Sequence, residues 1–275
     1  MNKMSVAQNE IRLDMENVTW KKEGTPILEQ INWKIRRGEH WVLLGLNGSG
    51  KTSLLNLLLG YEWPSSGKVS VLDNAFGQTN MQELRQRVGM VSTSLLERFQ
   101  KYPNMTVKEV VLSGPYASIG LYQKVEMKEY EKAMGILQQF EMETFADYPF
   151  HLLSQGQKVR VMLARAWMTD PSLLILDEPC SGLDVRMREH LLMTVEEMMN
   201  QPNSPTILYV THHLEEIVPA FTHVLLLKDG KAVHAGDKHE VLQERNLEIA
   251  FELPVKIHWE EDRPWISVKN SGGMG

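Results

Sequence analysis

The chain has 275 residues, 43% of them hydrophobic and 23% charged, which predicts one globular domain with additions and excludes a disordered, collagen-like or coiled-coil chain. Its formal net charge of −6 makes nucleic acid unlikely as the main partner, because a phosphate backbone attracts proteins with an excess of Lys and Arg. Cys180 is the single cysteine, so we expect no intrachain disulfide, no cysteine zinc site and a reducing compartment, the cytosol.

The first part of the chain changes from a β pattern to a strand followed by a helix. Residues 11–38 contain short β-prone runs separated by turns, which predicts an antiparallel β element. Residues 40–44 then form an apolar run typical of a strand, 45–50 a glycine-rich turn, and 52–59 an apolar helix. This order predicts a βα unit, the beginning of a parallel sheet.

The middle of the chain is predicted to be mainly helical. Two short strands, at 67–72 and 88–91, flank a helical segment at 81–87. Apolar residues then follow helical spacing in three segments, at 107–112, 127–140 and 154–168. We therefore expect an inserted helical subdomain over about 95–168.

Strands and helices alternate again in the remainder of the chain. The pattern predicts strands at 173–176, 206–211 and 224–227, and helices at 184–200 and from about 214. Beyond Gly230 it predicts one more strand, a helix near 238–244, and two β-like runs at 255–259 and 264–268. The expected organisation is a main α/β domain over 1–236 and a small α/β appendage over 237–275 with a mobile tail at 271–275. No apolar run approaches the roughly 18 residues of a membrane-spanning helix.

The glycine-rich turn matches the phosphate-loop pattern G-x-x-x-x-G-K-[ST], with a strand before it and a helix after it. Its residues are Gly45, Leu46, Asn47, Gly48, Ser49, Gly50, Lys51 and Thr52. Glycines let the backbone approach closely, so that amide groups and the positive end of the helix point at phosphate oxygens. Lys51 supplies a charge for the β- and γ-phosphates, and Thr52 offers a hydroxyl to Mg²⁺. A simple tight turn would explain the glycines but not the adjacent Lys51 and Thr52.

Two acids follow the apolar run at 173–176. This places Asp177 and Glu178 at the carboxyl edge of a predicted parallel strand, where ligands bind in such sheets. Asp177 is then positioned to hold Mg²⁺ through its water shell, and Glu178 to act as general base on an attacking water. An acid pair before a proline is otherwise typical of a solvated turn, but the phosphate loop favours the catalytic interpretation.

With these motifs in order, the chain resembles the single-cassette nucleotide-binding subunit of ATP-binding cassette (ABC) proteins over about 11–236. Residues 153–157, Leu-Ser-Gln-Gly-Gln, are similar to the family's LSGGQ motif, with Gln155 in place of the first glycine. The resemblance implies that Ser154, Gly156 and Gln157 contact the γ-phosphate held by a second copy, which closes two ATP molecules into a head-to-tail dimer. The same residues form an S-x-x-Q capping box at a helix start, and both interpretations hold together.

Two further segments are similar to motifs of this family. Residues 181–184, Ser-Gly-Leu-Asp, resemble the D-loop that lies across the dimer interface, although Asp184 also fits a helix cap. His212 ends an apolar strand and falls where the family's switch histidine touches the γ-phosphate and the water. A single histidine after a strand is otherwise usually structural.

The sequence departs from the family pattern at two positions. Thr93 stands where the family has a glutamine in a loop that links the metal site to a membrane partner. Lys22 stands where an aromatic residue stacks on adenine, and Trp20 lies two residues away on the same strand face, either as a substitute or, as we favour, packed in the β element.

The resemblance implies a P-loop NTPase core with a parallel sheet, an antiparallel β subdomain and an inserted helical subdomain. It implies an ATPase that uses Mg²⁺ and pairs with a second copy, with Glu178 and His212 as catalytic residues. The expected role is to power an integral membrane permease from the inner face of the cell membrane as a cytosolic, peripheral subunit. Residues 39–41 and 246–255 loosely resemble subunits linked to molybdate or metal uptake. Thr93 favours the alternative, an ABC ATPase without a permease that serves a regulatory or nucleic-acid-associated task.

Overall fold

The computed structural model describes residues 10–77, 80–121 and 124–269. The chain divides into two compact units. The first unit is Met1–Met81 with Met198–Gly275, and the second unit is Gln82–Glu197. The predicted mobile tail at 271–275 lies outside the described residues.

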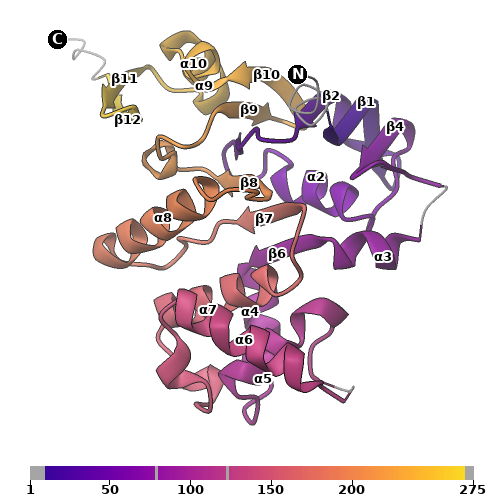
Figure 1. Ribbon diagram of the computed structural model, residues 1–275. Helices are drawn as coiled ribbons and strands as arrows, with labels where there is room; N and C mark the ends of the chain where they lie inside the picture. Colours follow the sequence, from indigo (N-terminus) through magenta and orange to yellow (C-terminus); the bar gives the residue numbers. More distant parts are fainter. Residues whose placement is uncertain (1–9, 78–79, 122–123, 270–275) are drawn as a thin grey trace, which may run out of the picture. The chain divides into compact units, whose positions relative to one another are not determined.

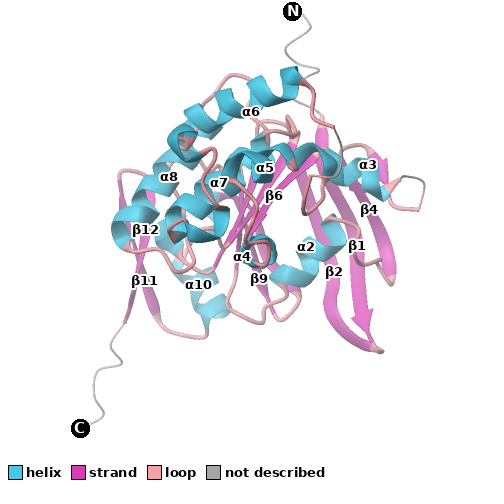
Figure 2. Cartoon of the chain, turned by 90° about the horizontal axis from the view of Figure 1, so that it is seen from below, coloured by secondary structure: helices cyan, strands magenta, loops and turns pink. Residues whose placement is uncertain are grey.

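The first unit contains an antiparallel sheet with the strand order β2-β1-β4-β5 (Figure 1). Its strands are β1 (Ile11–Lys22), β2 (Thr25–Arg36), β4 (Ser66–Val71) and β5 (Asn74–Ala75). In β2, alternate residues Ile31, Trp33 and Ile35 are buried while their neighbours face out, as expected for a strand with one covered face. Figure 2 shows β1, β2 and β4 side by side, and this sheet confirms the predicted β element.

A second group of strands in the first unit is mainly parallel. Strand β3 (Trp41–Leu44) lies between β8 (Thr206–Thr211) and β9 (His223–Lys228), parallel to both, and β10 (Lys231–Asp237) pairs antiparallel with β9. All residues of β3 and β8 are buried, which is typical of parallel strands covered on both faces. Helix α2 (Lys51–Leu58) follows β3, so the predicted βα unit is present.

The appendage and the segment after β8 differ from the prediction. The helix expected from about 214 is a single 3-10 turn, η4 (Leu214–Glu216), because Pro219 follows and disfavours helical backbone in the residue before it. The single helix expected near 238–244 is instead two helices, α9 (Lys238–Val241) and α10 (Glu244–Phe251). The two β-like runs form a hairpin of β11 (Val255–Glu260) and β12 (Arg263–Val268).

The second unit contains a parallel pair of strands and a group of helices. The pair is β6 (Val88–Ser92) and β7 (Leu173–Asp177). The helices are α4 (Thr93–Gln100), α5 (Val107–Leu112), α6 (Met127–Gln139), α7 (Gln155–Trp167) and α8 (Val185–Met199), with short turns η1 (Gly114–Tyr116), η2 (Glu143–Phe145) and η3 (Phe150–Leu152); α3 (Met81–Gln86) lies at the unit boundary. Figure 1 shows α4, α5, α6 and α7 gathered together, and their buried side chains include Phe99, Val110, Leu137 and Met162.

Helix α4 was not predicted as an element. It begins where Ser92, the last residue of β6, caps it by accepting a hydrogen bond from the amide of Leu95 (3.2 Å). Only Leu96 and Phe99 are buried in this short helix, so its apolar pattern is too weak to distinguish it from a loop.

Candidate active site

The phosphate loop turns sharply between β3 and α2. Gly48 and Gly50 have φ values of 84° and 106°, a left-handed conformation that glycine adopts without steric cost. Gly45 has no room for a side chain, since a β-carbon there would lie 2.4 Å from the carbonyl oxygen of Leu227 and 2.6 Å from Ser49 Oγ. The three glycines therefore have separate structural reasons to be glycine, and the loop leads directly into the first turn of α2.

Two side chains of the loop, those of Lys51 and Ser49, indicate that it binds an anionic ligand. Lys51 is 7% exposed, and its ammonium donates to the carbonyl oxygens of Gly45 (2.8 Å) and Leu46 (3.2 Å), which holds it folded over the loop. Among the described residues, the buried Ser49 hydroxyl has no hydrogen-bond partner. A buried polar atom left unpaired costs free energy, and a phosphate oxygen is an acceptor that fits this position. Thr52, at the second position of α2, is exposed.

His212 lies at the same edge of the first unit's parallel strands as the loop. Leu44 of β3 is in register with Thr211 of β8, and the amide of Gly45 donates to the carbonyl oxygen of Thr211 (3.4 Å). His212 follows Thr211 directly, and its ring lies 4.1 Å from the ring of His213. The structure thus brings the beginning of the phosphate loop and His212 to adjacent strand ends.

In the second unit, the two acids lie at the carboxyl end of β7 as predicted. Asp177 is the last residue of β7 and is in register with Ser92 of β6. Glu178 follows with a φ of 48°, a conformation that costs free energy for any residue other than glycine. Both side chains are partly exposed, whereas Cys180 beside them is buried.

The LSGGQ-like segment opens α7. Ser154 caps this helix by accepting a hydrogen bond from the amide of Gln157 (3.4 Å), and the Gln157 side chain accepts one from the amide of Ser154 (2.9 Å), so the capping box is present. The Ser154 side chain is exposed, while Gly156 is buried. A β-carbon on Gly156 would lie 2.1 Å from the terminal methyl of Met187 in α8. Burial lowers the pKa of Lys158, one turn into the helix.

The D-loop-like segment opens α8. The Asp184 carboxylate accepts a hydrogen bond from the amide of Met187 (2.9 Å), which is the helix-cap role. Because Met187 also lies against Gly156, the start of α8 is packed on the start of α7 within the second unit.

Thr93 and Trp20, the residues that concern the two departures from the family pattern, differ in exposure: Thr93 is exposed and Trp20 is buried. Thr93 is exposed as the first residue of α4, beside the buried capping residue Ser92. Trp20 is 9% exposed and paired with Leu28 across β1 and β2, so little of its ring is available to a base. The burial of Trp20 agrees with the interpretation that it packs in the β element.

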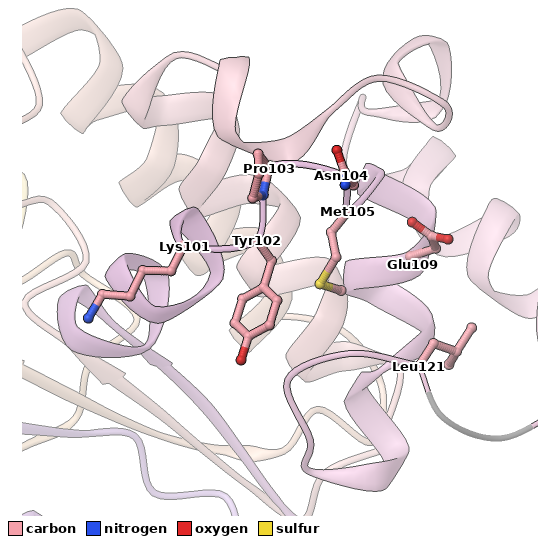
Figure 3. A pocket seen from close by; sticks show the side chains of 7 residues that line it. All are labelled: Lys101, Tyr102, Pro103, Asn104, Met105, Glu109 and Leu121. Atoms are coloured by element: carbon pink, nitrogen blue, oxygen red, sulfur yellow. The ribbon is translucent and has the colours of Figure 1, made fainter.

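A pocket of about 270 Å³ follows α4 in the second unit (Figure 3). Its lining residues are Lys101, Tyr102, Pro103, Asn104, Met105, Glu109 and Leu121. In Figure 3 the Tyr102 ring and the Met105 side chain lie near each other in the middle of the pocket, and Glu109 reaches it from α5. Tyr102 is 43% exposed, so the pocket presents an aromatic surface to solvent. Six of the lining residues lie within 101–109, and Leu121 is the one that comes from a later segment. No sequence pattern identified this pocket.

Across residues 10–77, 80–121 and 124–269, no helix combines the length and the apolar character needed to cross a membrane.

Comparison with known proteins gives a consistent result. The family model described as ABC transporter matches residues 28–181. The uncharacterized ABC transporter ATP-binding protein YlmA of Bacillus subtilis (strain 168) is 46% identical over 256 residues, which cover 93% of this chain and 96% of that protein. An ABC transporter ATP-binding protein of Streptococcus mutans serotype c is 41% identical over 251 residues, covering 91% of this chain and 96% of that protein.

A solved structure has a similar fold. It is described as an inward-facing conformation of a metal-chelate type ABC transporter, and it is similar to this chain with a TM-score of 0.75 and 26% identity. The match covers 94% of this chain and 97% of that one. Similarity in sequence and in fold therefore extends over nearly the whole chain.

Proposed function

The chain belongs to the ABC transporter family of ATP-binding proteins, and on this basis we propose that it hydrolyses ATP as a Mg²⁺-dependent head-to-tail dimer that powers a membrane permease. The ATPase role follows from the family. The observation that best supports the residue roles is the phosphate loop, where Lys51 is folded onto the Gly45 carbonyl oxygen and the buried Ser49 hydroxyl has no hydrogen-bond partner.

Within the proposal, the loop binds the triphosphate. Its amide groups donate hydrogen bonds to the phosphate oxygens at the positive end of α2. Lys51 exchanges its contacts with the Gly45 and Leu46 carbonyl oxygens for the β- and γ-phosphates. Glu178 accepts a proton from the attacking water, and His212 orients that water and the γ-phosphate.

Thr52 and Asp177 are the residues proposed to hold Mg²⁺. Their hydroxyl and carboxylate oxygens are the hard donors that this ion prefers, and Mg²⁺ in ATPases is typically completed by phosphates and waters rather than by further side chains. When bound, the ion neutralises charge on the β- and γ-phosphates.

A second copy of the chain is proposed to complete each site. Ser154, Gly156 and Gln157 would reach the γ-phosphate held by the other copy, and Asp184 would lie across the interface. The exposed Ser154 side chain at the N-terminus of α7 supports this, because a helix N-terminus attracts an anion. Under this proposal one chain alone turns over ATP poorly.

The pocket after α4 is the proposed contact for the permease. It begins one residue beyond the helix that Thr93 opens, and the family's glutamine loop at that position connects the metal site to a membrane partner. Tyr102 and Met105 offer an apolar surface that a cytoplasmic segment of the permease can cover. Exposed Thr93 in place of glutamine favours the alternative, an ABC ATPase that acts without a permease.

Two measurements test the proposal. Glu178→Gln should retain ATP binding, lower kcat at least about 100-fold and accumulate an ATP-bound dimer visible by light scattering. Asp170→Asn is a matched control. Asp170 also has a positive φ of 48°, but it forms an ion pair with Lys132 and has no proposed role in hydrolysis. Unchanged hydrolysis in Glu178→Gln contradicts the general-base role. For transport, the tagged chain is isolated from gently solubilised membranes; a polytopic companion that is lost in Tyr102→Ala supports the permease, and no companion supports the alternative.

A further inference from the structure

The turn that carries His212 contains a buried acid that the sequence motifs do not explain. Glu216, at the end of η4, is 4% exposed. One carboxylate oxygen, Oε2, accepts hydrogen bonds from two hydroxyl groups, Thr211 Oγ1 at 2.6 Å and Tyr209 Oη at 3.0 Å. Burial of a carboxylate costs free energy unless it is hydrogen-bonded, so the folded chain needs these two hydrogen bonds to Glu216.

Thr211 links this acid to both sides of His212. Its hydroxyl donates to Glu216 and accepts a hydrogen bond from the amide of His213 (3.0 Å). Its carbonyl oxygen accepts from the amide of Gly45, the first residue of the phosphate loop (3.4 Å). Thr211 and His213, the residues on either side of His212, are therefore both hydrogen-bonded through the Thr211 hydroxyl.

The C-terminal appendage holds the same turn from outside. Arg263, the first residue of β12, donates from Nε to the carbonyl oxygen of Glu215 (2.6 Å). Lys238, which is 4% exposed at the start of α9, donates to the carbonyl oxygen of Pro219 (2.9 Å) and pairs with Asp262 in the hairpin turn (2.5 Å). Figure 2 shows this hairpin as β11 and β12. Two cations of the appendage thus bind backbone oxygens within the segment that follows His212.

We propose that Thr211 and Glu216 are positioning residues for His212, and that the C-terminal hairpin supports them through Arg263. The inference rests on the proposed function, in which His212 contacts the γ-phosphate and the attacking water. It assigns to the appendage a role in hydrolysis. A displaced His212 would leave nucleotide binding to the phosphate loop intact and slow only the chemical step.

The test is a set of double-mutant cycles on the full chain, read out by steady-state ATP hydrolysis. Thr211→Val removes the hydroxyl with little change of volume and should lower kcat about 10-fold or more, with KM for ATP changed less than about 2-fold. Thr211→Ser restores the hydroxyl and should restore most of kcat. In a His212→Ala background, Thr211→Val should have less than about a 2-fold further effect, because the residue it positions is already absent.

Arg263→Ala provides a second arm that does not alter the core, in case Thr211→Val fails to fold as judged by thermal unfolding. It should lower kcat several-fold in the natural background and leave it unchanged beside His212→Ala. The control is Lys256→Ala, which removes an exposed cation from the same hairpin. If His212→Ala does not lower kcat, the proposed role of His212 fails and this inference fails with it. Suppose instead that His212→Ala does lower kcat. The inference alone is then overturned if Thr211→Val and Arg263→Ala leave kcat unchanged in the natural chain, or if they lower it just as much in the His212→Ala background.

Discussion

Gly45 lies against Leu227 so closely that a β-carbon on Gly45 would be 2.4 Å from the Leu227 carbonyl oxygen. The contact joins the first residue of the phosphate loop to strand β9, far away in the sequence. Backbone atoms cannot yield as the end of a side chain can, so this glycine has a packing reason in addition to any role toward phosphate.

Gly45→Ala should therefore destabilise the fold as well as weaken nucleotide binding. We expect a loss of about 1–3 kcal/mol in the free energy of unfolding, the usual cost of overpacking a closed site. The matched control is Gly135→Ala in helix α6, where a new β-carbon meets nothing within 4 Å. That substitution should stabilise by about 0.5–1 kcal/mol, because alanine favours a helix interior. The measurement is the free energy of unfolding of both variants in urea. An equal change in the two variants would contradict the close contact of Gly45 with Leu227.

Lys51→Ala should weaken ATP binding by about 10- to 100-fold, since hydrogen bonds to charged groups contribute about 1.5–3 kcal/mol. The variant also loses the two contacts from the ammonium to the Gly45 and Leu46 carbonyl oxygens, so its thermal unfolding is recorded in parallel. Affinity for a fluorescent ATP analogue is the measurement. Lys231→Ala, an exposed cation paired with Glu29 in the same unit, is the control. An unaltered affinity in Lys51→Ala would remove the phosphate-loop assignment.

Ser154 caps α7 and is proposed to contact a γ-phosphate, and one pair of variants separates these two roles. Ser154→Asp keeps a good helix-capping side chain but adds a negative charge where the proposed dimer brings a γ-phosphate. We expect its unfolding free energy to stay within about 0.5 kcal/mol of the natural chain, while ATP-dependent dimerisation and hydrolysis are lost. Ser154→Ala should cost about 1 kcal/mol in stability through the lost cap. Should Ser154→Asp form the ATP-bound dimer normally, Ser154 is a helix cap only.

Local patterns predicted most of the elements, and the differences have identifiable causes. Helix α5 and strand β8 have the predicted bounds, because their residues are continuously apolar or follow a clear helical period. The helix expected from about 214 is only the turn η4 because Pro219 follows, a signal that the sequence contains. The contact of Glu216 with Thr211 could not be predicted, since it forms only in the folded unit. Helix α4 depends on the Ser92 cap and on few buried residues, a signal too short for periodicity.

The identities of the candidate site residues were predictable from motifs, but their supports were not. A phosphate-loop pattern specifies Lys51 and its glycines by spacing alone. Sequence motifs do not predict that Leu227 packs against Gly45 or that Arg263 donates to the carbonyl oxygen of Glu215. These contacts join segments that are distant in sequence. The pocket beside Tyr102 was also missed, because a mixed run such as Lys101–Met105 has no pattern that distinguishes a pocket lining from an ordinary loop.

Buried His40 should make stability depend on pH. Burial lowers the pKa of His40 to about 4 from an ordinary value of 6.5, while its Nδ1 accepts a hydrogen bond from the amide of Ile207 (3.2 Å). Above pH 6.5 the residue is neutral in both the folded and the unfolded chain and has no effect. Between pH 6.5 and about 4 only the unfolded chain binds the proton, so the free energy of unfolding should fall as the pH falls, by about 3 kcal/mol in total from this residue.

The measurement is urea unfolding of the natural chain and of His40→Asn between pH 4 and 7. Asparagine keeps an acceptor for the Ile207 amide but cannot titrate, so the difference in stability between the two chains should narrow as the pH drops through that window. His258→Asn, on the hairpin strand β11, is the control for the same exchange at an exposed position. A constant difference for His40→Asn would mean that the buried ring is protonated as easily in the folded chain as in the unfolded one.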